Sequence, residues 1–151
     1  MNKWTAGIVA GLVATIVISV LMVLKGMMGL GDFNAIETNA ELVMKYAGTG
    51  GPVAGWVLHF VIGAVVWGLL YVALKDKLPG DGGLVRGLVF GVIAWLLMMV
   101  VWSPLAGEGV FGLPMMALGM TLMLHLVYGV VLGLVEEKLG NGASPDGGDA
   151  V

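Results

Sequence analysis

Four long runs of apolar residues dominate the sequence, and charged residues, glycines or prolines separate them. A helix needs about 20 apolar residues to cross the hydrocarbon core of a bilayer. The runs therefore predict four transmembrane helices, over residues 4–24, 53–74, 84–102 and 115–135. The third helix is expected to break at Ser103-Pro104 and again at Gly107-Glu108-Gly109, because proline and glycine interrupt helices.

The connection between the first two runs has the periodicity of an amphipathic helix. Its apolar residues recur three or four positions apart from Phe33 to Ala47, and its charged residues fall between them. Asn34 followed by Glu37 resembles a capping box, with asparagine in place of the usual serine or threonine. We expect a short helix over about residues 34–47, on the end of the bundle or at the membrane interface.

The two ends of the chain carry different patterns. The start resembles a signal peptide, but its apolar run is too long and no Ala-x-Ala site follows, so a retained first span is expected. Residues 140–151 contain glycine, aspartate, serine and proline with almost no large apolar side chains, which favours disorder. Residues 1–139 should therefore form one membrane domain.

The composition supports a membrane protein and argues against a soluble domain, cysteine-based sites and a nucleic-acid partner. Of 151 residues, 59% are hydrophobic and only 11% are charged, whereas soluble domains contain about 25% charged residues. The chain has no cysteine, which excludes disulfides, thiolate metal sites and covalently attached haem. The net charge is −3 with no basic block, so no nucleic-acid partner is expected.

The distribution of basic residues predicts the orientation in the membrane. Four spans bring both termini to one side of the bilayer. Five basic residues fall on that side and two, Lys25 and Lys45, on the other, which favours cytoplasmic termini. The bilayer is the expected surrounding and other membrane subunits are candidate partners, with the oligomeric state open.

The chain also repeats itself weakly. Residues 7–14 of the first span match residues 87–94 of the third, and the second and fourth spans share Leu-His-x-Val-x-Gly. The sequence therefore predicts an all-α bundle of four transmembrane helices, built from two tandem hairpins in parallel repeat, over residues 4–74 and 84–135. In the first span, small residues recur every four positions and predict close helix packing: Gly7, Gly11, Thr15 and Ser19.

The only two histidines occupy equivalent positions in this repeat. Gly55 and Gly63 flank His59, and Thr121 and Gly129 flank His125, each four residues away. Residues four apart share one face of a helix. Each histidine should therefore lie in a shallow trough between small residues, and an ionisable side chain within a span is a functional candidate.

Paired histidines on facing helices favour a low-spin b-type haem. Two neutral imidazoles would supply its axial ligands, His59 and His125. The wide porphyrin needs room beside the helix backbones, which Gly55, Gly63, Thr121, Gly129 and Gly133 could supply. The function expected from this site is that of an electron carrier or a small subunit of a respiratory assembly.

Other interpretations of the histidines stay open. They could serve packing in a non-catalytic scaffold or assembly subunit, or a proton relay in a small proton-linked transporter or channel. A quinone site is a further candidate. Methionines near His125 would suit Cu(I) together with imidazole, but methionine is also a common core filler. We find no nucleophile–base pair, phosphate loop or pair of acids, so an enzyme is not expected unless electron transfer is counted.

Three motifs resemble a known group of proteins. They are Gly-x-Val-x-Gly at Gly7–Gly11, Gly-Trp-Val-Leu-His-Phe at Gly55–Phe60, and Leu-His-Leu-x-Tyr-Gly at Leu124–Gly129. They resemble an uncharacterised family of small four-helix bacterial membrane proteins and, more distantly, the YagU-like inner-membrane proteins. The resemblance covers residues 4–135 and implies a bacterial cytoplasmic membrane location, but no activity. The YagU-like branch is associated with acid tolerance, which would suit a proton-linked histidine.

Overall fold

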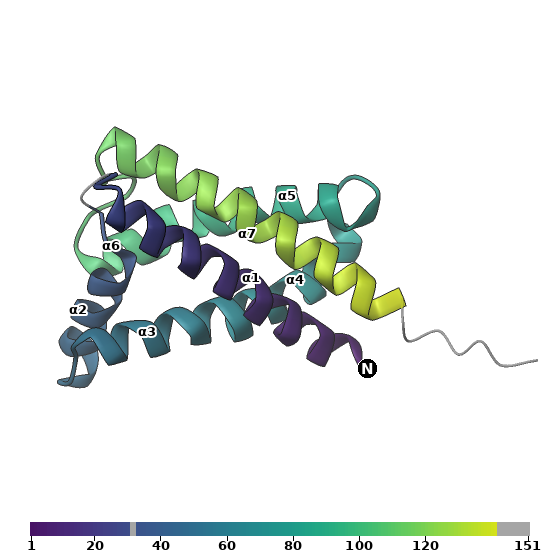
Figure 1. The fold of residues 1–151 in the computed structure, drawn as a ribbon, viewed down its shortest axis with the longest axis horizontal. Helices are drawn as coiled ribbons and strands as arrows, with labels where there is room; N and C mark the ends of the chain where they lie inside the picture. Colours follow the sequence, from purple (N-terminus) through teal and green to yellow (C-terminus); the bar gives the residue numbers. More distant parts are fainter. Residues whose placement is uncertain (31–32, 142–151) are drawn as a thin grey trace, which may run out of the picture.

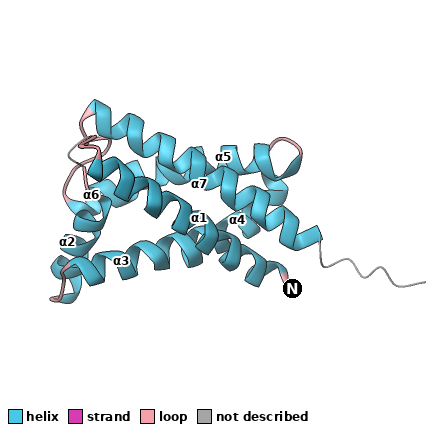
Figure 2. Ribbon diagram, viewed as in Figure 1, coloured by secondary structure: helices cyan, strands magenta, loops and turns pink. Residues whose placement is uncertain are grey.

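A computed structural model describes residues 1–30 and 33–141, and these are helical over most of their length with no strand among them (Figure 2). Four helical stretches are long and apolar enough to cross a membrane: Lys3–Met27, Pro52–Lys77, Gly82–Ala106 and Met115–Gly140. The elements in order are α1 (Lys3–Met27), α2 (Ala35–Ala47), α3 (Pro52–Phe60), η1 (Val61–Trp67), α4 (Gly68–Leu74), η2 (Lys75–Lys77), α5 (Gly82–Leu97), η3 (Met98–Trp102), α6 (Ser103–Ala106) and α7 (Met115–Asn141).

The third span runs further than its sequence predicts. The helix does not break at Ser103-Pro104 but continues through α6 to Gly107, which adopts a left-handed conformation and caps it. Pro104 lacks the N–H that an α-helix would need at this point. It directly follows η3, a π-helical segment in which the α-helical hydrogen bonding is already interrupted, so the proline is accommodated without a break.

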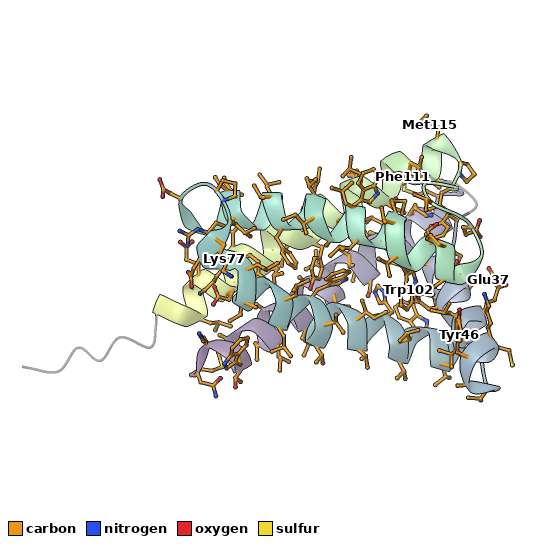
Figure 3. The ribbon with its side chains drawn as sticks, turned by 180° about the vertical axis from the view of Figure 1, so that it is seen from behind. Glu37, Tyr46, Lys77, Trp102, Phe111 and Met115 are labelled. Atoms are coloured by element: carbon orange, nitrogen blue, oxygen red, sulfur yellow. The ribbon has the colours of Figure 1, made fainter. Side chains whose placement is uncertain are left out.

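Helix α2 lies across the end of the bundle opposite the termini (Figure 1). Asn34 is its N-cap, and the Asn34 side chain accepts hydrogen bonds from the backbone N–H groups of Ile36 and Glu37. Gly48 ends the helix in a left-handed conformation. Figure 3 shows Glu37 and Tyr46 on this helix at the opposite end of the molecule from Lys77.

The four spans pack through small residues and one aromatic centre. Each long helix runs antiparallel to its neighbour, and α7 lies against both α1 and α5 (Figure 1). Phe90 on α5 is fully buried, and its ring makes edge contacts with Tyr71 and Trp67 of the second span at centroid distances of 5.3 and 6.2 Å. Many other large apolar side chains are exposed, which is expected of a surface that lipid covers.

The two hairpins differ in register. In a strict repeat, Gly7 corresponds to Gly87 and Gly63 corresponds to Gly129. Gly7 would then pack on Gly63 in the same way as Gly87 packs on Gly129. In the structure Gly87 packs on the backbone of Gly129, but Gly63 packs beside Gly11. The hairpins are therefore offset by four residues, about one helical turn.

Both ends of the described chain lie at the same end of the bundle (Figure 1). Helix α7 extends to Asn141, which is past the start of the segment for which disorder is expected. Residues 142–151 of that segment lie outside the described residues.

Candidate functional site

The two histidines line one cavity of about 880 Å³, which we call the histidine cavity. It lies between the four spans, beneath α2. Along the helix axes, His59 lies about 10 Å from the start of α3 and His125 about 15 Å from the start of α7, at a rise of about 1.5 Å per residue. The two histidines therefore lie at different distances from the starts of their helices, by roughly one turn, in keeping with the register offset.

The hydrogen bond made by His125 determines its tautomer. Its Nδ1 lies 2.8 Å from the backbone carbonyl oxygen of Thr121. A carbonyl can only accept, so Nδ1 carries the proton and donates it. The other ring nitrogen, Nε2, is then unprotonated, and its lone pair is available to the histidine cavity.

His59 is held by a different partner, Ser19 on α1. The Oγ atom of Ser19 lies 3.1 Å from Nε2 of His59 and 2.7 Å from the backbone carbonyl oxygen of Thr15. The hydroxyl has one proton, and the carbonyl of Thr15 can only accept it. Ser19 therefore accepts a hydrogen bond from Nε2–H of His59, and Nδ1 of His59 is the unprotonated nitrogen.

Residues around the histidines fix the shape of the cavity. The indole Nε1 of Trp95 donates to Oγ1 of Thr121 at 3.1 Å, and Oγ1 donates to the carbonyl oxygen of Ala117 at 2.8 Å. The hydroxyl of Tyr128 donates to the carbonyl oxygen of Gly63 at 2.6 Å. These contacts join α5 to α7 and α7 to the second span, so the walls of the cavity are bonded to one another.

Helix α2 lines the end of the cavity away from the chain termini. Asn39 is buried and lines it, and the Asn39 Oδ1 atom accepts a hydrogen bond from Nε1 of Trp102 at 3.2 Å. Lys45 Nζ donates to the carbonyl oxygen of Leu105 at 3.1 Å. Helix α2 is therefore fastened to the end of the third span.

Both π-helical segments face the histidine cavity. Ile62, Gly63, Val66 and Trp67 line it from η1, and Met98, Val101 and Trp102 line it from η3. Short π-helical segments within α-helices occur frequently at functional sites. Their coincidence with the histidines marks this cavity as the candidate functional site.

The residues predicted to line a cofactor separate into two groups. His59, His125, Gly63 and Thr121 line the cavity, whereas Gly55, Gly129 and Gly133 do not. A Cβ atom on those three glycines would meet backbone of a neighbouring helix: the carbonyl oxygens of Ile36, Gly87 and Gly83 respectively. In this packing, close helix contacts fill the space beside these three glycines, which their expected role beside a porphyrin requires to be open. Gly63 also packs on a neighbour, the side chain of Thr15.

Two features of the site escaped the sequence analysis. Ser19 appeared only as a packing residue, since nothing in one helix shows which histidine it meets on another. Asn39 had a usable signal, because it lies three residues after Ile36 on the apolar face of the amphipathic helix. A polar residue at such a position needs a partner, which here is Trp102.

The groups on the lining that could bind a ligand include the two imidazoles and the carboxylate of Glu37. Within the described residues, no three His, Asp or Glu side chains come together to hold a metal ion. Met98 and Met120 line the cavity, so thioethers are also present. Lys25 lies on the lining, where its Nζ donates to the carbonyl oxygen of Phe33 at 2.7 Å.

Comparison with known proteins adds a family but no activity. No curated protein and no solved structure matches the chain. Residues 1–146 match a family of unknown function, DUF6789. The chain therefore belongs to the DUF6789 family.

Proposed function

We propose that the protein is a b-type haem protein of the membrane, and that His59 and His125 bind haem in the histidine cavity. Its role would be that of an electron carrier or a small subunit of a respiratory assembly. One observation carries the proposal: both imidazoles line the same cavity, and each has an unprotonated nitrogen. Haem would supply a one-electron couple, and a cavity of about 880 Å³ is within the usual size of cofactor sites.

The two histidines fit this role unequally. His125 presents Nε2 while its Nδ1–H is held by a backbone carbonyl, an arrangement typical of histidines that bind metals. His59 presents Nδ1, which is bonded to the ring carbon that carries Cβ. A macrocycle bound at Nδ1 would therefore be crowded by the Cβ atom and the helix backbone. Ligation by His59 therefore requires its Nε2 to leave Ser19. The proposal also needs imidazoles from both hairpins, so it includes the tandem-hairpin arrangement.

The bond between His59 and Ser19 favours a second candidate function, the binding of a quinol. Two unprotonated ring nitrogens are hydrogen-bond acceptors, and the hydroxyls of a quinol are donors. A mainly apolar cavity with a few placed polar groups suits such a ligand. Quinol binding requires the hydrogen bond from Nε2–H of His59 to Ser19, because this bond leaves Nδ1 as an acceptor. Haem ligation through Nε2 of His59 requires the same bond to break.

The visible spectrum tests the haem proposal. We expect protein produced with haem precursor and purified in detergent to show the Soret band of a low-spin haem. His59→Ala and His125→Ala should each abolish that spectrum, because each would remove one of the two proposed ligands. Met123→Ala is the matched control, since Met123 is exposed and lies two residues before His125; its spectrum should be unchanged. A folded but colourless wild-type protein would falsify the haem proposal.

Ser19→Ala separates the two candidate functions. If haem is bound, the variant frees Nε2 of His59 and should keep or strengthen the low-spin spectrum. If a quinol is bound, the variant no longer keeps the proton of His59 on Nε2. Binding of a short-chain quinol should then weaken by about tenfold, as for one lost hydrogen bond. A colourless protein with no quinol binding would leave a packing role for the histidines, as in a scaffold subunit.

We also propose that the protein resides in a bacterial inner membrane with cytoplasmic termini. The basic residues support this, since five of them cluster at the end of the bundle that holds the termini. The chain has no cysteine, so single-cysteine variants are informative. In intact cells, Glu41→Cys on α2 should react with an impermeant maleimide, and Asp81→Cys between η2 and α5 should react only after lysis. The reverse pattern would overturn the orientation.

A further inference from the structure

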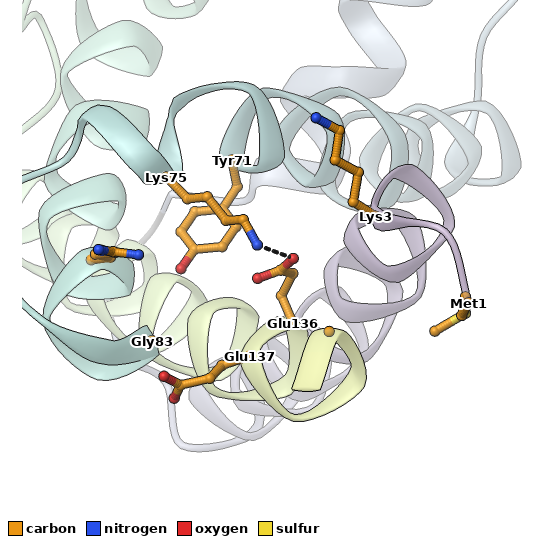
Figure 4. Close-up of a pocket in the computed structure, with 9 residues that line it drawn as sticks. Met1, Lys3, Tyr71, Lys75, Gly83, Glu136 and Glu137 are labelled. Carbon is orange, nitrogen blue, oxygen red and sulfur yellow. Dashed lines mark hydrogen bonds and ion pairs between the residues drawn. The ribbon is translucent and has the colours of Figure 1, made fainter. Parts of the chain in front are cut away.

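A second cavity lies at the end of the bundle that holds the termini, far from the histidines. It has a volume of about 420 Å³ and opens between the ends of α1, α4, α5 and α7 (Figure 4). We call it the terminal cavity. Its lining is polar and includes Lys3, Tyr71, Lys75, Arg86, Glu136 and Glu137.

The hydroxyl of Tyr71 has no partner among the described residues, although the residue is only 1% exposed. Its ring is fixed against Phe90, and Figure 4 shows the phenolic oxygen directed into the terminal cavity beside Lys75 and Glu136. The contrast is Tyr128, equally buried, whose hydroxyl donates to the carbonyl oxygen of Gly63. Although the residue as a whole is buried, its oxygen opens onto the terminal cavity, so the hydroxyl can donate to a ligand bound there.

The charges around that hydroxyl favour an anion. Lys75 Nζ lies 2.6 Å from Oε1 of Glu136, which is buried, so these two charges neutralise each other. Arg86 donates from Nε to the carbonyl oxygen of Gly80 at 3.2 Å, and its two terminal nitrogens carry further donors. Lys3, whose Nζ lies 5.1 Å from the centre of the Trp4 ring, and Glu137 complete the charged side chains of the lining. Counting side chains alone, three cations and two carboxylates leave one net positive charge.

The start of α5 adds donors at the same place. Its N-cap residue, Asp81, makes no side-chain capping hydrogen bond. Gly83, in the first turn, lines the terminal cavity. The first N–H groups of a helix lack intrahelical acceptors and carry the positive end of the helix dipole, which favours oxyanions such as phosphate.

We propose that the terminal cavity binds the phosphate group of an anionic phospholipid. The Tyr71 hydroxyl and the Arg86 guanidinium would donate to its oxygens, Lys3 would add positive charge at the rim, and the Lys75–Glu136 pair would form the floor. A phosphodiester carries one negative charge, which balances the net charge of the lining. Basic cavities between the ends of membrane helices suit such headgroups. This site shares no residue with the histidine cavity and does not depend on the function proposed for it.

Native mass spectrometry of the full chain in detergent tests the proposal. Wild-type protein should retain phosphatidylglycerol in preference to phosphatidylcholine, because the choline cation would face Lys3 and Arg86. Tyr71→Phe removes only the unpartnered hydroxyl, so the fold should survive. Retention of phosphatidylglycerol should fall about tenfold, as for one hydrogen bond to a charged group, and Arg86→Gln should act similarly. Tyr46→Phe, at an exposed tyrosine on α2, and Lys77→Gln are the matched controls.

Inorganic phosphate distinguishes a lipid headgroup from a free ion. If millimolar phosphate raises the melting temperature of wild type but not of Tyr71→Phe, and lipid retention is the same in both, the site takes free phosphate and the lipid proposal is wrong. Equal retention of both lipids by wild type and Tyr71→Phe, with no effect of phosphate, overturns the site altogether. Preferential retention that is lost in Tyr71→Phe and kept in Tyr46→Phe supports it.

Discussion

Replacing Gly129 with leucine is expected to prevent α5 and α7 from packing. A Cβ atom at Gly129 would already meet the carbonyl oxygen of Gly87 and lie 2.9 Å from the Cα of Gly91. These are backbone atoms, which cannot move aside as a flexible side chain would. Overpacked positions in well-packed interiors cost about 1–3 kcal/mol and occasionally more, and we expect a loss of about 3 kcal/mol or more here.

Gly119→Leu is the control for this prediction. Gly119 lies on the same helix, but a Cβ atom there would meet nothing within 4 Å. Reversible denaturation by SDS in mixed micelles measures both variants. Equal stability of Gly129→Leu and Gly119→Leu would show that the two helices do not approach as closely as described. The comparison also separates packing from cofactor loss, because Gly129 does not line the histidine cavity.

Replacing Lys75 with methionine is expected to destabilise the protein by about 3 kcal/mol. The side chains of Lys75 and Glu136 are 22% and 3% exposed, so the change leaves a buried carboxylate without its counter-charge. Removal of one partner of a buried pair costs about 3–5 kcal/mol, and the partial exposure of Lys75 favours the lower end. Lys77→Met, at an exposed lysine two residues later, should change stability very little.

The double variant Lys75→Met/Glu136→Leu makes this prediction sharper. Replacement of both members of a buried ion pair by apolar residues is often neutral or stabilising. The double variant should therefore recover most of the stability that Lys75→Met loses. If the double variant is as unstable as the single one, the loss comes from packing of the lysine stem and not from the uncompensated charge.

The sequence predicted the helices well, but it did not predict which residues of one helix contact which residues of another. Four apolar runs predicted four spans, and an asparagine cap with helical spacing predicted α2, because both signals are contained within single helices. The register between hairpins could not be read in this way. It depends on which small residue of one helix meets which carbonyl of another, and several glycines of α1 and α5 could have fitted.

The candidate site shows the same division. His59, His125 and Thr121 were identified because they share a pattern within their own helices. Gly55 and Gly133 fitted that pattern equally well, yet they pack against backbone, since a glycine in a span makes room for a helix as readily as for a ligand. Tyr71 gave no signal at all, because an unpartnered hydroxyl is visible only once its surroundings are known.

The π-helical segment η1 has a consequence for the inward face of the second span. His59 and Tyr71 both face inward, each into its own cavity. They are twelve positions apart, and an unbroken α-helix would set them about 120° apart around its axis. One extra residue taken up by η1 reduces that angle to about 20°. The extra residue in η1 thus brings His59 and Tyr71 onto the same face of the second span. One helix can therefore line two chemically different cavities from the same side.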